Sequence, residues 1–215
     1  MKNVRLIYSK KDRMRFVSHL DMTRFMSRMI QKAKIPVWYT EGFNKHIYVT
    51  FALPLSLGFE SDYEVMDFRL DDDNFPFEET KERLQSVFPE YIKIIDLFEP
   101  TMKTGEIAFA DFDIVFETGD EAFKTKINDF LSQGEILVSK KNKKGAICEI
   151  DIAPKIKNYS VLQNEKTVLK ITLSAGSKDN VNPQIVLSAM EKNGVLPNFS
   201  VCRTAVYNEK LELFR

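Results

Sequence analysis

Few of the residues that build catalytic and metal centres occur in this sequence. Its 215 residues include two cysteines, two histidines and eight glycines. Cys148 and Cys202 lie far apart without neighbouring ligand residues, which indicates reduced, buried thiols rather than a disulfide framework or a zinc site. The sequence also lacks a glycine-rich phosphate loop, a cysteine triplet for an iron–sulfur cluster and a Gly-x-Ser-x-Gly turn. We therefore expect no cofactor and no bound metal.

Long apolar runs are missing as well. A membrane-spanning helix needs about 18 or more consecutive apolar residues, and no such uncharged stretch occurs. Residues 1–6 alternate charged and apolar side chains, where a signal peptide needs a continuous apolar segment. With 44% hydrophobic and 12% aromatic residues, the chain still has ample side chains for packed cores. The sequence predicts a folded cytoplasmic protein with no membrane partner.

Charges of opposite sign are segregated along the chain, although the net charge is zero. Residues 1–48 carry eleven Lys and Arg against three acids, a net charge of +8, whereas residues 60–99 carry four against thirteen, a net charge of −9. This asymmetry indicates either a cationic surface for a polyanionic partner or two parts of one domain that attract each other.

The hydrophobic pattern predicts the order strand, helix, several strands, helix, strand in each half of the chain. The first half is expected to hold strands at 4–8 (continued at 15–17), 37–39, 47–53, 63–70 and 91–98, and helices from 18 and over 77–88. The second half is expected to hold strands at 108–116, 136–139, 146–152, 167–173 and 200–207, and helices at 121–131 and 183–190. We expect an α+β fold of two tandem ferredoxin-like (βαββαβ) units with antiparallel sheets, in domains 1–100 and 106–215.

Both histidines lie in the basic segment. His19 follows Ser18, which opens a helix with Asp21 three residues later in a capping-box-like arrangement, and His46 ends a Gly-Phe-Asn-Lys-His loop. Near Arg24 and Arg28, such a pair has the groups to hold a phosphate or to act as acid and base in RNA cleavage. A structural role for each histidine is the alternative, and the residues alone leave both open.

The candidate binding residues come from this helix and loop. They are Arg15, Ser18, His19, Asp21, Arg24, Arg28, Gly42, Phe43, Asn44, Lys45 and His46. Two other charged runs have simpler interpretations: the acids at 71–73 read as a solvated turn at a strand end, and the lysine-rich run at 140–144 reads as a hairpin tip that either touches nucleic acid or aids solubility.

The spacing of these residues resembles the radical SAM-linked (radical SAM-associated) protein family, domain of unknown function 2344. The resemblance rests on the run Arg-Phe-Val-Ser-His-Leu-Asp at 15–21, on Gly-Phe-Asn at 42–44 with His46, and on Phe-Ala-x-Pro-Leu-x-x-Gly at 51–58. The family loop reads Gly-Phe-Asn-Pro-His-Pro, so Lys45 and Ile47 depart from it. The match is close over roughly the first 70 residues and diffuse beyond.

The resemblance implies a companion of a radical SAM enzyme, because the family, whose function is unknown, occurs beside or fused to such enzymes. We therefore expect an accessory protein that binds RNA or presents a substrate to a separate radical SAM enzyme. Two alternatives remain: a metal-independent ribonuclease-like enzyme that uses His19 and His46, and a protein–protein scaffold that binds no nucleic acid. The sequence favours a binding protein over an enzyme.

Overall fold

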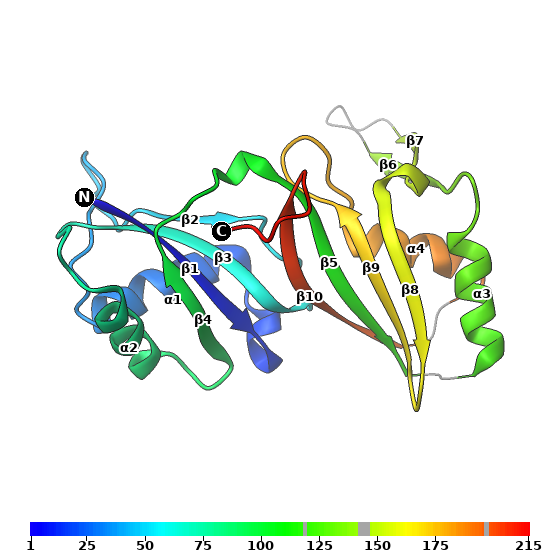
Figure 1. The fold of residues 1–215 in the computed structure, drawn as a ribbon, viewed down its shortest axis with the longest axis horizontal. Coiled ribbons are helices and arrows are strands. Elements are labelled where there is room, and N and C mark those ends of the chain that lie inside the picture. The colour runs from blue at the N-terminus through cyan, green and yellow to red at the C-terminus, as the bar shows by residue number, and fades with distance from the viewer. Residues whose placement is uncertain (118–119, 142–146, 196–197) are drawn as a thin grey trace. The chain divides into compact units, whose positions relative to one another are not determined.

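The protein has a mixed α+β fold. The computed structural model describes residues 1–117, 120–141, 147–195 and 198–215. Within them the chain forms two compact units, Met1–Thr104 with Phe214–Arg215, and Gly105–Leu213 (Figure 1). No helix among the described residues has both the length and the apolar character needed to cross a bilayer.

In the first unit, four antiparallel strands and two helices alternate along the chain. In chain order they are β1 (Lys2–Lys10), α1 (His19–Lys32), β2 (Val49–Ala52), β3 (Glu60–Leu70), α2 (Phe77–Val87) and β4 (Ile92–Phe98). The spatial strand order is β4-β1-β3-β2, and every pairing is antiparallel. A short 3-10 helix, Asp12–Phe16, leads from β1 into α1.

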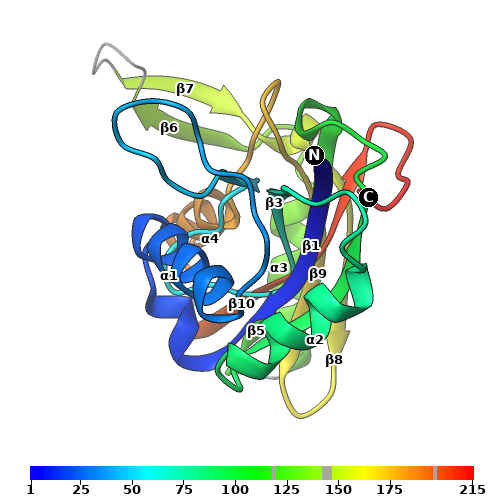
Figure 2. The same ribbon diagram turned by 90° about the vertical axis from the view of Figure 1, so that its left-hand side faces the viewer.

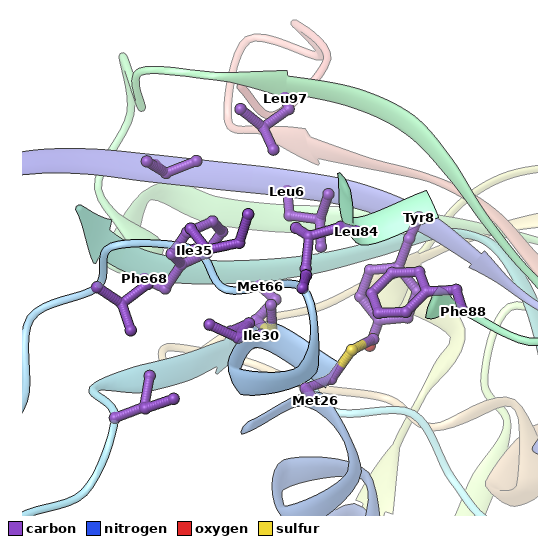
Figure 3. Packing of buried hydrophobic residues seen from close by; sticks show 14 of the residues in the cluster. Leu6, Tyr8, Met26, Ile30, Ile35, Met66, Phe68, Leu84, Phe88 and Leu97 are labelled. Atoms are coloured by element: carbon purple, nitrogen blue, oxygen red, sulfur yellow. The ribbon is translucent and has the colours of Figure 1, made fainter. Parts of the chain in front are cut away.

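Both helices of this unit lie on one side of the sheet (Figures 1 and 2) because alternate strand residues give that side an apolar surface. Leu6 of β1 pairs with Met66 of β3, and both side chains are buried. From α1, Met26 and Ile30 pack onto them, and Leu84 of α2 joins the same cluster (Figure 3). The side chains between these strand positions therefore face away from the helices.

The second unit has a four-stranded sheet, a separate two-stranded sheet and two helices. In chain order they are β5 (Ile107–Phe116), α3 (Glu121–Leu131), β6 (Leu137–Lys141), β7 (Ile147–Asp151), β8 (Ile156–Gln163), β9 (Thr167–Ser174), α4 (Pro183–Lys192) and β10 (Phe199–Asn208). The larger sheet has the order β10-β5-β9-β8, and β6 pairs with β7 alone. The 3-10 turns Thr104–Glu106 and Ala153–Lys155 complete the described elements.

Two strand predictions in the first unit are wrong. The expected strand at 15–17 is occupied by the end of the 3-10 helix, because Asp12 has φ 53° and turns the backbone out of the extended conformation. Residues 37–39 form only isolated bridges, from Val37 to Leu70 and from Tyr39 to Ile47.

In the second unit, the predicted hairpin is not part of the larger sheet. The structure places β6 and β7 in their own sheet and puts β8, which the sequence analysis missed, beside β9. The side chains of β8 alternate only between half-buried and exposed positions, as in a strand at the end of its sheet. Its hydrophobic alternation is therefore too weak to mark it in the sequence.

Phe214 and Arg215 pack against the first unit. Tyr63 donates a hydrogen bond of 2.9 Å to the Phe214 carbonyl, and the guanidinium of Arg5 lies 4.3 Å from the centre of the Phe214 ring. Arg215 forms an ion pair of 2.6 Å with Asp96. These contacts bury Tyr63, and burial raises the pKa of its hydroxyl from 10.0 to about 12, against the opposing effect of Arg215.

Replacement of Ser18 by Ala is expected to lower the free energy of unfolding by about 1 kcal/mol, because an N-cap side chain satisfies a free backbone N–H at the start of a helix. In the structure, Ser18 Oγ accepts from the Asp21 N–H at 3.2 Å. Urea denaturation measures the change, with Ser27→Ala in the same helix as the control. Equal stability of the two variants would contradict the assignment of Ser18 as the cap.

Stability is expected to fall between pH 10 and 12 because of Tyr63. The folded-state pKa is raised, so Tyr63 contributes stability below pH 10 that is lost as the pH rises through about 12. The Tyr63→Phe variant lacks this contribution and should lose less stability over the same range. Spectrophotometric titration should find one late-ionising tyrosine fewer in the variant than in the wild type. Identical pH profiles of the two proteins would contradict the assignment to Tyr63.

Candidate functional site

The outer face of α1 carries a row of exposed cations. Arg24, Arg28 and Lys32 are four residues apart, so they share one face of the helix, whereas Met22 and Met26 are buried on the other. We call these three cations the α1 cationic stripe. Arg24 contacts Asp21 at 3.4 Å with both side chains more than 60% exposed, and an exposed pair of this kind is weak. Arg28 and Lys32 have no ion-pair partner among the described residues.

Three predicted site residues near the start of α1 have structural roles. Ser18 caps the helix and donates a hydrogen bond of 2.7 Å to Asp21. Arg15 is half-buried, lies 3.6 Å from Glu60 in an ion pair, and stacks 4.8 Å from the ring centre of Phe16. These contacts fix the entry into α1.

His19 is exposed but lies apart from the α1 cationic stripe. Its ring packs edge-on against Phe51 of β2, with ring centres 5.2 Å apart. Arg28 is nine residues later, which is about two and a half turns at 3.6 residues per turn. The two side chains therefore leave the helix on opposite sides.

The 40–46 loop is closed at its base and exposed at its tip. Tyr39 bridges Ile47, and the Thr40 N–H donates to the His46 carbonyl at 2.8 Å. Gly42 has φ 134°, a conformation that favours glycine, and Phe43 next to it is fully exposed. Asn44 and Lys45 are exposed as well. The loop thus presents an aromatic ring and a cation to solvent.

Within this loop, the imidazole of His46 is held by the backbone. Its Nδ1 lies 3.0 Å from the Asn44 carbonyl and 3.1 Å from Thr40 Oγ1. Because a carbonyl oxygen only accepts, Nδ1 carries the proton of this hydrogen bond. The neutral ring therefore has its free lone pair on Nε2.

The two histidine rings make separate contacts in the structure. His19 contacts Phe51 of β2, whereas His46 contacts Asn44 and Thr40 within its own loop. An acid–base pair needs both groups within hydrogen-bond reach of one reacting centre. The structure brings His19 to β2 and His46 to its own loop, and no described contact joins them.

Part of the basic segment is neutralised by the acidic one. Arg5 pairs with Asp67 at 2.7 Å, and Lys11 pairs with Asp62 at 2.8 Å. Together with the Arg15–Glu60 pair, these contacts follow from the antiparallel pairing of β1 with β3. The charge segregation of the sequence therefore serves the fold in part, and the α1 cationic stripe is among the cations that remain exposed.

A polar pocket that sequence reasoning missed lies on the sheet face opposite the helices. Its volume is about 510 Å³, and all of its lining residues belong to the first unit. The polar ones on the strands and beside them are Asn3, Arg5, Tyr48, Thr50, Asp67 and Arg69. We call it the sheet-face pocket. The sequence does contain a pattern that indicates this pocket. Charged residues alternate with apolar ones in the two strands, namely Arg5, Asp67 and Arg69.

No arrangement of His, Cys, Asp and Glu in the described part of the chain groups three side chains as a metal site. Asp72, in the predicted acidic turn, accepts a hydrogen bond of 2.9 Å from the Asn74 N–H. Most of the lysine-rich run at 140–144 lies outside the described residues.

These features define a mixed α+β protein with an exposed cationic helix, an exposed loop and a polar pocket. A model of the family described as an uncharacterised protein conserved in bacteria, DUF2344, matches residues 3–183. The chain belongs to this family. No curated protein matches the sequence.

One solved structure with a similar fold is a chain from the crystal structure of a Cbf5-Nop10-Gar1 complex. It is 11% identical in sequence and has a TM-score of 0.49. The match covers 95% of this chain and 50% of that one, so the present chain spans about half the length of that protein.

His46 is expected to be the Nδ1-protonated tautomer when neutral, because the Asn44 carbonyl accepts from Nδ1. Nitrogen-15 NMR of the histidine rings distinguishes the two tautomers. His19, whose ring contacts only Phe51 among the described residues, is the internal control and should sample both. A His46 ring protonated on Nε2 would contradict the loop geometry.

Proposed function

We propose that this protein is a non-catalytic, cytoplasmic accessory protein that binds RNA through the α1 cationic stripe. The observation that carries the proposal is the row of Arg24, Arg28 and Lys32 on one exposed helix face. Eight residues of helix rise about 12 Å, so the row is long enough to follow several backbone atoms of a nucleic acid strand. Neutralisation of phosphates by Lys and Arg provides most of the sequence-independent affinity of such proteins.

Phe43 and Lys45 of the 40–46 loop support single-stranded or looped RNA as the ligand. An exposed aromatic ring next to a cation is the combination on which unpaired bases stack. Phe43 is fully exposed, and the closed base of the loop holds it there at a low cost in conformational entropy. Bases within a duplex are already stacked and do not reach such a ring.

A second candidate function is the docking of a protein partner, which the family resemblance suggests is a radical SAM enzyme. Three large apolar side chains near the start of α1 are about 60% exposed, namely Phe16, Leu20 and Leu57. Leu57 is brought to this region because the Gly58 N–H donates to the Arg15 carbonyl at 2.8 Å. Apolar side chains exposed together favour a protein contact. A partner bound here leaves the α1 cationic stripe available for RNA.

A ribonuclease function receives no support from the geometry, because no contact among the described residues joins His19 to His46. The proposed role therefore assigns neither histidine to proton transfer.

We also infer that both units are ferredoxin-like. The strand order β4-β1-β3-β2 of the first unit and the order β10-β5-β9-β8 of the second place equivalent strands at equivalent positions. In this interpretation β6 and β7 are an insertion between the first helix and the second core strand of the second unit. The helices of each unit follow its first and third core strands, as that topology requires.

Charge reversal of Arg24 and Arg28 to Glu is expected to weaken RNA binding at least about tenfold and to reduce its salt dependence. On single strands each phosphate contact contributes about −0.7 to the slope of log K against log salt, so the loss of two contacts should lower the slope by about 1.4. Fluorescence anisotropy with a labelled single-stranded and a labelled hairpin RNA, at several salt concentrations, measures both quantities.

The matched control is the double variant Lys126→Glu/Lys192→Glu, which makes the same change in net charge at two exposed helix positions of the second unit. It should bind RNA nearly as the wild type does. Binding that is insensitive to salt, or that weakens equally in the two double variants, would overturn the proposal. Absence of RNA binding with retained capture of a radical SAM enzyme would favour the docking function.

A further inference from the structure

The sheet-face pocket is a second site, separate from the α1 cationic stripe. Arg5 and Asp67 face each other across β1 and β3, on the side of the sheet opposite Leu6 and Met66, which pack against α1. The residues 100–104 after β4 form one wall of the pocket. Its volume of about 510 Å³ lies within the range of sites that take small ligands, about 300–1,000 Å³.

The side chain of Arg69 is fixed in an orientation that suits anion binding. Its Nε donates to the Asn3 side chain at 3.2 Å, and its guanidinium lies 4.7 Å from the ring centre of Tyr48 and 5.3 Å from that of Trp38. The two rings contact each other edge-on, with centres 5.9 Å apart. The terminal Nη1 and Nη2 groups have no hydrogen-bond partner among the described residues. A guanidinium group fixed in this way can donate two parallel hydrogen bonds to two oxygens of a phosphate or carboxylate.

Arg5 and Asp67 form a neutral floor for the pocket. Arg5 is 1% exposed, and its Nε and Nη2 donate to the two carboxylate oxygens of Asp67 at 2.8 and 2.7 Å. Its remaining Nη1 donates to the Met102 carbonyl at 2.9 Å. Because this pair is satisfied internally, the positive charge of Arg69 is left without a counter-charge in the lining. Lys103 adds a second cation to the wall, so the lining has a net charge of +2.

The corresponding sheet face of the second unit has a pocket of opposite charge. A smaller pocket of about 230 Å³ lies over the equivalent strands β5, β9 and β8, and its charged lining residues are Asp111, Asp113 and Lys170. Its net charge is therefore −1, and Asp113 lies 3.5 Å from Lys170 in an ion pair. The same sheet face thus favours anions only in the first unit.

We propose that the sheet-face pocket binds the phosphate group of a small phosphate ester of mononucleotide size, with Arg69 as the principal phosphate ligand. The hydroxyl groups of Thr50 and Tyr48 are further donors in the lining, and the Tyr48 ring provides an apolar side for a flat ring in the ligand. The cationic charge favours a phosphate dianion over a single carboxylate. This inference does not depend on RNA binding by the α1 cationic stripe.

Calorimetric titration of the full chain with adenosine monophosphate, adenosine and inorganic phosphate tests the proposal. We expect saturable binding of adenosine monophosphate and none of adenosine. Tighter binding of the monophosphate than of inorganic phosphate identifies an ester as the ligand, and equal binding identifies free phosphate. Binding of adenosine as tight as that of its monophosphate would overturn the site.

Arg69→Gln should weaken binding of the monophosphate at least tenfold. The matched control is Arg83→Gln, which also removes an arginine stacked on an aromatic ring, 5.3 Å from the centre of Phe75, but on α2. It should bind as the wild type does. Equal affinity of Arg69→Gln and wild type would also overturn the proposal. If Arg69→Gln fails to fold, Thr50→Ala and Tyr48→Phe each remove one hydroxyl donor, and unchanged affinity in both would count against the site equally.

Discussion

The buried ion pair between Arg5 and Asp67 is the contact on which the first unit depends most. A charge taken out of water costs several kcal/mol unless it is paired and hydrogen-bonded. Arg5 uses its guanidinium nitrogens on Asp67 and on the Met102 carbonyl, and its face is covered by the Phe214 ring. One side chain therefore joins β1 to β3, to the segment after β4 and to the end of the chain. The guanidinium group of Arg5 therefore fixes four parts of the sequence in one arrangement, because any other arrangement would leave its buried charge unpaired.

This pair also explains how the charges of the sequence divide between structure and binding. The acids of β3 neutralise cations of β1 and of the turn that follows it, so those cations hold the sheet together. Among the cations left over, those of the two candidate sites lie on separate faces. Arg28 and Lys32 are exposed on α1, and Arg69 is directed to the opposite side of the sheet by Asn3 and two aromatic rings. A neutral protein in total thus carries two local cationic surfaces.

The sequence predicted those features that depend on local pattern. The cap at Ser18 and the buried face of α1 follow from residues three and four apart, and the structure has both. Prediction from the sequence failed for features that depend on contacts between residues far apart in the chain. The weakly alternating β8 is a strand because β9 pairs with it, and the sheet-face pocket joins Arg5 to residues more than 60 positions away. His19 and His46 looked like a pair because both lie in one basic segment, yet in the structure His19 contacts Phe51 of β2 and His46 contacts its own loop.

The position of Phe214 and Arg215 in the first unit has a consequence for how the protein is made. Chains are synthesised from the N-terminus, and early domains commonly fold before later ones appear. Here residues 1–104 leave the ribosome without the ring that covers Arg5 and without the carbonyl that accepts from Tyr63. The first unit is therefore completed only after the second unit has been synthesised. Its final packing requires translation of the whole second unit, which couples the maturation of the sheet-face pocket to the synthesis of residues 105–213.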